Sequence, residues 1–128
     1  MNVDGLKKIV GDEWVVTQRD QITGYLADET YLGVLPKPAE NVVVVKPANA
    51  EEISAILKLA NEDGTPVYPR GGGTGLVGAA VPTRDGIVLS LERLDKILEV
   101  DKDNMMVVAE GGVTLEHLLK EVEDNDLL

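Results

Sequence analysis

The chain has 128 residues, of which 44% are hydrophobic, a composition typical of a globular domain with an apolar core. Its 12 basic and 23 acidic residues give a net charge of −11, which repels phosphate backbones and excludes nucleic acid as the expected partner. The lack of cysteine excludes disulfides, thiolate metal sites and cysteine nucleophiles. Because no apolar run has the length of a signal-peptide core or a membrane span, we expect a cytoplasmic protein without a transmembrane segment.

Residues 1–39 are expected to form a helical and extended lead-in, and residues 40–128 the main domain. Within the lead-in, apolar residues recur at helical spacing over residues 3–10 before Gly11 ends the predicted helix. The rest of this segment has a mixed pattern, with a helical stretch around residues 20–26 and an extended segment imposed by Pro36 and Pro38. The sequence therefore predicts an extension of the main domain rather than a separate one.

The main domain opens with a strand and a helix. Residues 41–46 are a nearly continuous valine run, the pattern of a strand buried on both faces. Asn49 is the predicted N-cap of the helix that follows, with Glu52 able to complete a capping box, and Gly64 ends it. Its buried stripe is expected to comprise Ile53, Ile56, Leu57 and Ala60. A strand over residues 65–69 then completes a βαβ unit, which predicts a parallel strand pair.

Short strands are expected next, and their close spacing predicts antiparallel pairing. They lie at about residues 87–90, 97–101 and 105–109. Thr114 is a plausible N-cap for a last helix. The fold class predicted from the whole pattern is α+β, with a small parallel βαβ unit followed by an antiparallel sheet.

The stretch PRGGGTGLVGAAVP, from Pro69 to Pro82, is the candidate binding loop. It holds five of the 13 glycines between Gly71 and Gly78, which costs backbone entropy on folding. Glycines let main-chain N–H groups converge on an anion, and Arg70 and Thr74 add a positive charge and a hydroxyl donor. The pattern predicts a phosphate or pyrophosphate site, and the alternative is a flexible surface turn.

Two familiar phosphate loops do not fit this stretch. A P-loop needs a lysine after its last glycine, and this loop has none. Gly73, Gly75 and Gly78 match the G-x-G-x-x-G pattern of dinucleotide-binding proteins, but that motif needs a helix starting within the glycines. Pro82 and the turn at residues 84–86 leave no room for one. Binding by a loop between strands is therefore expected, with an NAD-binding protein as a disfavoured alternative.

Ordered blocks over residues 40–128 carry a family resemblance. They are the valine-rich strand ending in Pro47, the helix with Glu51 and Glu52, the glycine loop, the strand GIVLSL, and VVAEGGVT before the last helix. In these blocks the chain resembles the FAD-binding domain of the vanillyl-alcohol oxidase and p-cresol methylhydroxylase superfamily, in its FAD-linked glycolate oxidase and D-lactate dehydrogenase branch. The resemblance implies a PCMH-type fold with the cofactor between two subdomains.

The resemblance also implies which residues bind FAD. The pyrophosphate loop falls on residues 70–76, the flavin neighbours on Gly78 and Ala79, and a second flavin-contacting turn on residues 110–113. The complete predicted set is Pro69, Arg70, Gly71, Gly72, Gly73, Thr74, Gly75, Leu76, Gly78, Ala79, Pro82, Glu110, Gly111, Gly112 and Val113. Members with covalent flavin often carry histidine where this loop has Gly73, and cysteine attachment is impossible here, so FAD is expected to be non-covalent.

The activity implied is oxidation of a small 2-hydroxy acid, such as glycolate or D-lactate, by hydride transfer to the flavin, with electrons passed to an acceptor that could be another subunit. The family continues into further FAD-binding and substrate-binding segments, so the chain is expected to be an N-terminal fragment, inactive alone. The alternative is a stand-alone nucleotide-binding or assembly module without catalysis. No catalytic residue and no metal site are predicted.

Several polar and aromatic residues receive a structural interpretation. His117 lies on the last predicted helix, away from the loop, and is not expected to act as an acid or base. Trp14 and Tyr25 are expected to be packing residues, as is Tyr31, and Asp28 is expected to be solvated together with its neighbour Glu29. Glu110 is expected to turn its side chain away from a diphosphate, because the two negative charges would repel. The acidic residues at 121–126 are expected to be a solvated helix face.

Overall fold

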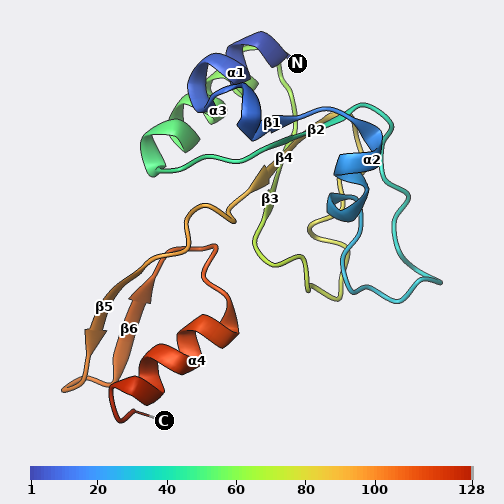
Figure 1. The fold of residues 1–128 in the computed structure, drawn as a ribbon. Coiled ribbons are helices and arrows are strands. Elements are labelled where there is room, and N and C mark those ends of the chain that lie inside the picture. Colours follow the sequence, from blue (N-terminus) through green and yellow to red (C-terminus); the bar gives the residue numbers. More distant parts are fainter. Residues whose placement is uncertain (128) are drawn as a thin grey trace.

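The computed structural model describes residues 1–127 as a mixed α+β fold with two sheets (Figure 1). The first sheet has four strands in the order β1-β2-β4-β3, and the second is the two-stranded ribbon β5-β6. In chain order the elements are α1 (Val3–Val10), η1 (Asp12–Trp14), β1 (Val15–Val16), α2 (Arg19–Ile22), η2 (Thr23–Tyr25), β2 (Val42–Val45), α3 (Ala50–Glu62), β3 (Val67–Arg70), β4 (Gly86–Ser90), β5 (Ile97–Asp101), β6 (Met106–Ala109) and α4 (Leu115–Asp124).

Strand β4 lies between β2 and β3, which corrects two predictions. β4 pairs in parallel with β2 (Gly86 with Val42) and, on its other edge, with β3 (Ile87 with Val67). The strands of the predicted βαβ unit are therefore parallel but not neighbours, and the strand at residues 87–90 is not antiparallel. Every residue of β4 is buried, so this strand takes the central position where both edges are paired. Gly86 permits the insertion, because a Cβ there would lie 2.4 Å from the carbonyl oxygen of Pro66.

The four valines of β2 are buried because both faces of the sheet are covered. On one face, Val43 and Val45 pack against α1 and α3 in a cluster that also includes β1 and β4. On the other face, Val42 and Val44 pack against residues of α2 and η2. Residues 1–39 thus contribute side chains to both faces of the core, while the domain boundary at residue 40 stays a prediction.

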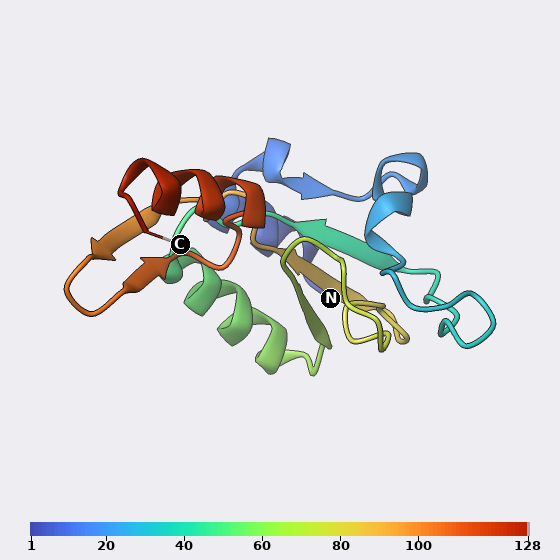
Figure 2. The same cartoon turned by 90° about the horizontal axis from the view of Figure 1, so that it is seen from below.

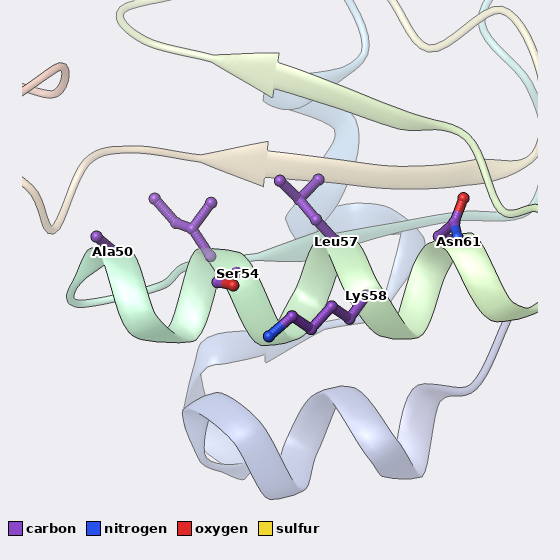
Figure 3. Close-up of a pocket in the computed structure, with 6 residues that line it drawn as sticks. Ala50, Ser54, Leu57, Lys58 and Asn61 are labelled. Atoms are coloured by element: carbon purple, nitrogen blue, oxygen red, sulfur yellow. The ribbon is translucent and has the colours of Figure 1, made fainter.

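Helix α3 begins as predicted but buries a narrower stripe. The Asn49 side chain accepts a hydrogen bond from the Glu52 N–H at 2.9 Å, and the Glu52 carboxylate accepts one from the Ala48 N–H at 2.7 Å. Ile56 and Ala60 are buried as expected, but Leu57 is 46% exposed. The prediction for Leu57 was wrong, because α1 and the sheet cover only part of the helix. An open groove of about 570 Å³ on α3 is lined by Ala50, Ile53, Ser54, Leu57, Lys58 and Asn61 (Figure 3).

The β5–β6 ribbon and α4 lie beside each other in both views (Figures 1 and 2). β5 and β6 pair antiparallel, as predicted, with a bulge between Ile97 and Glu99. Helix α4 starts at the predicted N-cap, where the Thr114 hydroxyl accepts a hydrogen bond from the His117 N–H at 3.2 Å. None of the helices in residues 1–127 combines the length and the apolar character that crossing a membrane requires.

Candidate functional site

The glycine loop joins the parallel strands β3 and β4 without an intervening helix, as predicted. Arg70, the last residue of β3, pairs with Ser90, the last residue of β4. The carboxyl ends of both strands therefore meet at one edge of the sheet, and the loop leaves from that edge. In sheets of this kind ligands bind at the carboxyl ends of the strands.

A cavity of about 350 Å³ opens at this edge of the sheet. It is lined by Gly24, Tyr25, Arg70, Gly71, Gly72, Ser90, Glu92, Gly112 and Thr114. The glycine loop and the turn at residues 110–113, which the sequence predicted to share a ligand, therefore meet across it. Gly71 is close enough to the turn that a Cβ on it would lie 3.5 Å from the Gly111 carbonyl oxygen. The cavity lies where the four-stranded sheet meets the β5–β6 ribbon and α4.

The loop presents main-chain donors without protein acceptors. Within residues 1–127, no hydrogen bond is donated by the main-chain N–H of any residue from 71 to 77, or by that of Gly111. In the same turn, the N–H groups of Gly112 and Val113 are bonded to the carbonyl oxygens of Leu94 and Glu110. Unpaired N–H groups on a glycine-rich backbone are the donor set that binds phosphate oxygens. The residues present therefore fit a diphosphate.

The Arg70 side chain is bonded to the protein. Its guanidinium donates hydrogen bonds to the carbonyl oxygens of Ala27 at 2.8 Å and Gly24 at 3.0 Å, and it lies over the Tyr25 ring at 5.7 Å. Gly73 makes this possible, because its φ is +71° and a Cβ there would overlap the guanidinium. Arg70 thus anchors the loop to residues 24–27. Direct contact of its charge with a diphosphate stays a prediction.

The remaining predicted residues have different positions. Pro82 is buried, and its carbonyl oxygen accepts a hydrogen bond from the Ala39 N–H at 2.8 Å. The Glu110 carboxylate accepts a hydrogen bond from the Lys96 N–H at 3.0 Å, and its orientation relative to a diphosphate stays a prediction. The predicted residues that do not line this cavity are Pro69, Gly73, Thr74, Gly75, Leu76, Gly78, Ala79, Pro82, Glu110, Gly111 and Val113. Their roles as cofactor ligands stay predictions.

Sequence reasoning missed the charged cluster beside the cavity. The Lys46 Nζ lies 2.6 Å from a Glu92 carboxylate oxygen, and the Tyr25 hydroxyl donates to the same oxygen at 3.0 Å. Burial alone would raise the pKa of Glu92, but the hydrogen bonds from Lys46 and Tyr25 outweigh it and lower that pKa. Burial alone would lower the pKa of Lys46, but the bond to Glu92 raises it. Both shifts favour the charged forms, so the two opposite charges of the ion pair compensate each other beside the cavity.

A signal for this cluster was present in the sequence. Lys46 follows β2 directly, and Glu92 stands two residues after the end of β4. Both strands are parallel, so polar residues just beyond their carboxyl ends are brought to the same edge of the sheet. Tyr25 packs against the core beside Val42 and Val44, as expected, but its hydroxyl contact with Glu92 is brought about only by the folded chain.

The structure also tests the expectations for Asp28, Trp14, Tyr31 and His117. Asp28 is not solvated as expected, because its Oδ2 atom is buried and has no hydrogen-bond partner among residues 1–127. Trp14 packs as expected, with the Arg93 guanidinium 3.9 Å above its ring. Tyr31 is 78% exposed and is not a packing residue. His117 is exposed on α4 and does not line the cavity.

Comparison with known proteins identifies the family. Residues 42–128 match the family model described as an FAD binding domain. The chain belongs to this FAD-binding domain family. The family resemblance predicted from the sequence is thereby confirmed, and so is FAD as the cofactor of the domain.

Two relatives of this FAD-binding domain are named for enzymatic activities. D-lactate dehydrogenase of Archaeoglobus fulgidus is 60% identical over 94 residues, which cover 73% of the chain and 21% of the relative. Glycolate oxidase subunit GlcD of Bacillus subtilis is 38% identical over 84 residues, which cover 66% of the chain and 18% of the relative. The chain therefore spans about a fifth of the length of these relatives.

Solved structures share the fold of the FAD-binding domain. P-cresol methylhydroxylase superimposes with a TM-score of 0.81 and 23% identity, over 98% of this chain and 24% of that one. The 4-ethylphenol oxidase from Gulosibacter chungangensis gives a TM-score of 0.82 and 25% identity, over 97% of this chain and 24% of that one. The predicted PCMH-type α+β fold, a small parallel unit followed by an antiparallel ribbon, is confirmed.

Proposed function

We propose that this chain is the cofactor-binding part of an FAD-dependent oxidoreductase that oxidises a small 2-hydroxy acid of the D-lactate or glycolate type. The observation that carries the proposal is the loop of unpaired N–H groups beside a cavity, in a chain that matches the FAD-binding family over residues 42–128. The substrate class is supported by the names of the relatives, D-lactate dehydrogenase and glycolate oxidase subunit.

In this proposal the protein binds the diphosphate of FAD through main-chain donors. The N–H groups of residues 71–77 supply hydrogen bonds without adding positive charge, and the opposite charges of the Lys46–Glu92 pair compensate each other beside the cavity. Arg70 fixes the loop by its bonds to residues 24–27. When bound, FAD supplies the two-electron redox chemistry that amino-acid side chains lack.

Non-covalent attachment is part of the proposal. The chain has no cysteine, and its one histidine, His117, does not line the cavity. The proposal also includes a cytoplasmic location and a separate electron-accepting partner, which rest on the sequence expectations. Release of all flavin from the purified protein by acid or heat precipitation would support non-covalent binding, and flavin that stays with the precipitate would overturn it.

The first experiment is equilibrium dialysis of the purified chain against FAD, with absorbance spectra before and after. Saturable binding, with FMN and riboflavin binding more weakly, is expected because the loop binds the diphosphate. The substrate class is then tested on the FAD-loaded full-length protein by anaerobic addition of D-lactate or glycolate. Loss of the visible flavin absorbance with either acid, and not with L-lactate, supports the proposed substrates. An unchanged spectrum with both acids contradicts them.

A further inference from the structure

Residues 24–30 hold the glycine loop at its two ends and at Gly75, while the N–H groups of residues 71–77 stay unpaired. At the start of the loop, Arg70 donates to carbonyl oxygens of this segment, as described above. Further along, the Glu29 N–H donates to the Gly75 carbonyl oxygen at 2.9 Å. At the end, the Gly78 N–H donates to the Thr30 hydroxyl oxygen at 2.7 Å. These bonds use carbonyl groups, side chains and the Gly78 N–H, and none uses an N–H of residues 71–77.

Thr30 is itself fixed by Asp28. Thr30 is only 7% exposed, and its N–H donates to the Asp28 Oδ1 atom at 3.0 Å. The other carboxylate oxygen, Oδ2, is buried beneath the loop, and a Cβ on Gly75 would lie 3.6 Å from it. Hydrogen bonding with Thr30 holds the pKa of Asp28 below its ordinary value, so the carboxylate is ionised at neutral pH.

The negative charge of Asp28 does not favour binding of a diphosphate to the loop above it. This charge repels a diphosphate, and leaving one carboxylate oxygen buried without a donor opposes folding. The contribution of Asp28 must therefore come from its hydrogen bond with the Thr30 N–H, which orients Thr30. Thr30 in turn accepts the hydrogen bond from the Gly78 N–H, at a residue whose φ of +73° favours glycine and where a Cβ would lie 2.9 Å from Pro36.

We infer that Asp28 and Thr30 are positioning residues that set the shape of the glycine loop for the diphosphate of FAD. The inference rests on the proposed function. A loop with five glycines has many conformations in the free chain, and binding would have to select one of them. With both ends fixed, the unpaired N–H groups are arranged before the ligand arrives, so less affinity is lost to ordering the loop.

The test uses pairs of variants at each position, in which one variant removes the hydrogen-bonding group and the other keeps it. Thr30→Val removes the hydroxyl that accepts from Gly78 and keeps the shape of the side chain, whereas Thr30→Ser keeps the hydroxyl. Asp28→Ala removes the acceptor for the Thr30 N–H, whereas Asp28→Asn keeps an oxygen there. Thr65→Val is the matched control, because its hydroxyl bonds to Asp63 in the α3–β3 connection. The Asp28 pair carries the test by itself if Thr30→Val does not fold.

The first readout is amide hydrogen exchange in the chain without FAD. Thr30→Val and Asp28→Ala are expected to raise the exchange rate at Gly78 at least about tenfold, because the protecting bond is lost or loosened. Thr30→Ser, Asp28→Asn and Thr65→Val are expected to stay near wild type. Unchanged exchange at Gly78 in both loss variants would overturn the inference, whatever the chain does with FAD.

The second readout is FAD affinity by equilibrium dialysis, with circular dichroism to confirm that each variant is folded. The loss variants are expected to bind FAD about tenfold more weakly, with recovery in the Ser and Asn partners. Wild-type affinity in folded loss variants would overturn the positioning role and leave the proposed function standing. Failure of the wild-type chain and its full-length form to bind FAD would instead overturn the proposed function.

Discussion

The Lys46 Nζ lies 2.6 Å from a carboxylate oxygen of Glu92, although the two residues follow different strands, the parallel neighbours β2 and β4. Glu92 lines the cavity proposed for FAD, and Lys46 neutralises it. The Tyr25 hydroxyl completes the cluster by donating to the same oxygen. The negative charge of Glu92 beside a diphosphate site is thereby compensated. Removing Lys46 and removing Glu92 are therefore expected to change FAD affinity differently.

Lys46→Met is expected to weaken FAD binding about tenfold, because it leaves the Glu92 carboxylate unpaired beside an anionic ligand. Glu92→Gln is expected to bind FAD as tightly as wild type or more tightly, because it leaves the Lys46 charge unopposed. Lys58→Met, on the exposed side of α3, is the control for loss of a lysine (Figure 3). Equal losses of affinity in Lys46→Met and Glu92→Gln, measured by dialysis, would show that the pair matters for packing and not for charge.

Arg70 is expected to act through the geometry of its guanidinium. It reaches the Ala27 and Gly24 carbonyl oxygens at the same time, which a lysine ammonium on a flexible chain does not reproduce. Arg70→Lys and Arg70→Met are therefore expected to lower the free energy of unfolding by similar amounts, about 1–2 kcal/mol each, in urea titrations. Wild-type stability in Arg70→Lys would indicate that positive charge alone is sufficient at this position.

Alanine substitutions at Gly71 and Gly73 are expected to have different effects, the first on FAD affinity and the second on the stability of the fold. A Cβ on Gly71 would make only an ordinary contact with the Gly111 carbonyl oxygen, so Gly71→Ala is expected to melt within about 2 °C of wild type. Its methyl group would project into the site, and FAD affinity is expected to fall at least about tenfold. Gly73→Ala is expected to lose roughly 1–3 kcal/mol of stability, because φ is +71° and Arg70 occupies the space.

Thermal melts and dialysis on the two glycine variants check this separation. Gly64→Ala serves as the control, because Gly64 also has a positive φ, +67°, but lies at the end of α3. It is expected to lower stability without changing the FAD affinity of the folded protein. If Gly71→Ala binds FAD like wild type, the cavity between the glycine loop and residues 110–113 is not the diphosphate site.

The features that sequence reasoning predicted correctly depend on neighbouring residues. The Asn49 cap, the valine run of β2 and the lack of a helix after the glycine loop follow from local hydrogen bonding and from proline geometry. The glycine loop was predicted to be a binding site because five glycines cost backbone entropy on folding, and binding of a ligand by the main chain gives a reason for that cost. These signals extend over a few residues and can be interpreted without the fold.

The features that it missed depend on residues far apart in the chain. Tyr25 and Glu92 are separated by 67 positions, and no periodicity connects them. β4 pairs with β2 and β3, which lie far from it in the chain, and it becomes the buried central strand only once all three strands are arranged. Asp28 was expected to be solvated because an acidic residue in a loop usually is, and its buried Oδ2 atom follows from the loop that covers it.

The connection between α3 and β3 is expected to make stability pH-dependent through Asp63. The Thr65 hydroxyl and the N-terminal ammonium, 2.9 Å from the carboxylate, lower the pKa of Asp63 from 3.8 to about 2. In the unfolded chain the carboxylate binds its proton near the ordinary pKa, so lowering the pH between these two values favours the unfolded state. The stability that Asp63 contributes is therefore present above about pH 4 and is lost as the pH falls towards 2.

Urea midpoints measured between about pH 5 and pH 2 test this expectation. Asp63→Asn lacks the titrating group, so its midpoint is expected to fall less than that of wild type across this range. Asp20→Asn makes the same change in net charge on α2 and controls for the general effect of removing a carboxylate. If Asp63→Asn and Asp20→Asn flatten the pH profile equally, the effect belongs to the net charge of the protein. A flatter profile in Asp63→Asn alone assigns it to the contacts of Asp63 with Thr65 and the chain terminus.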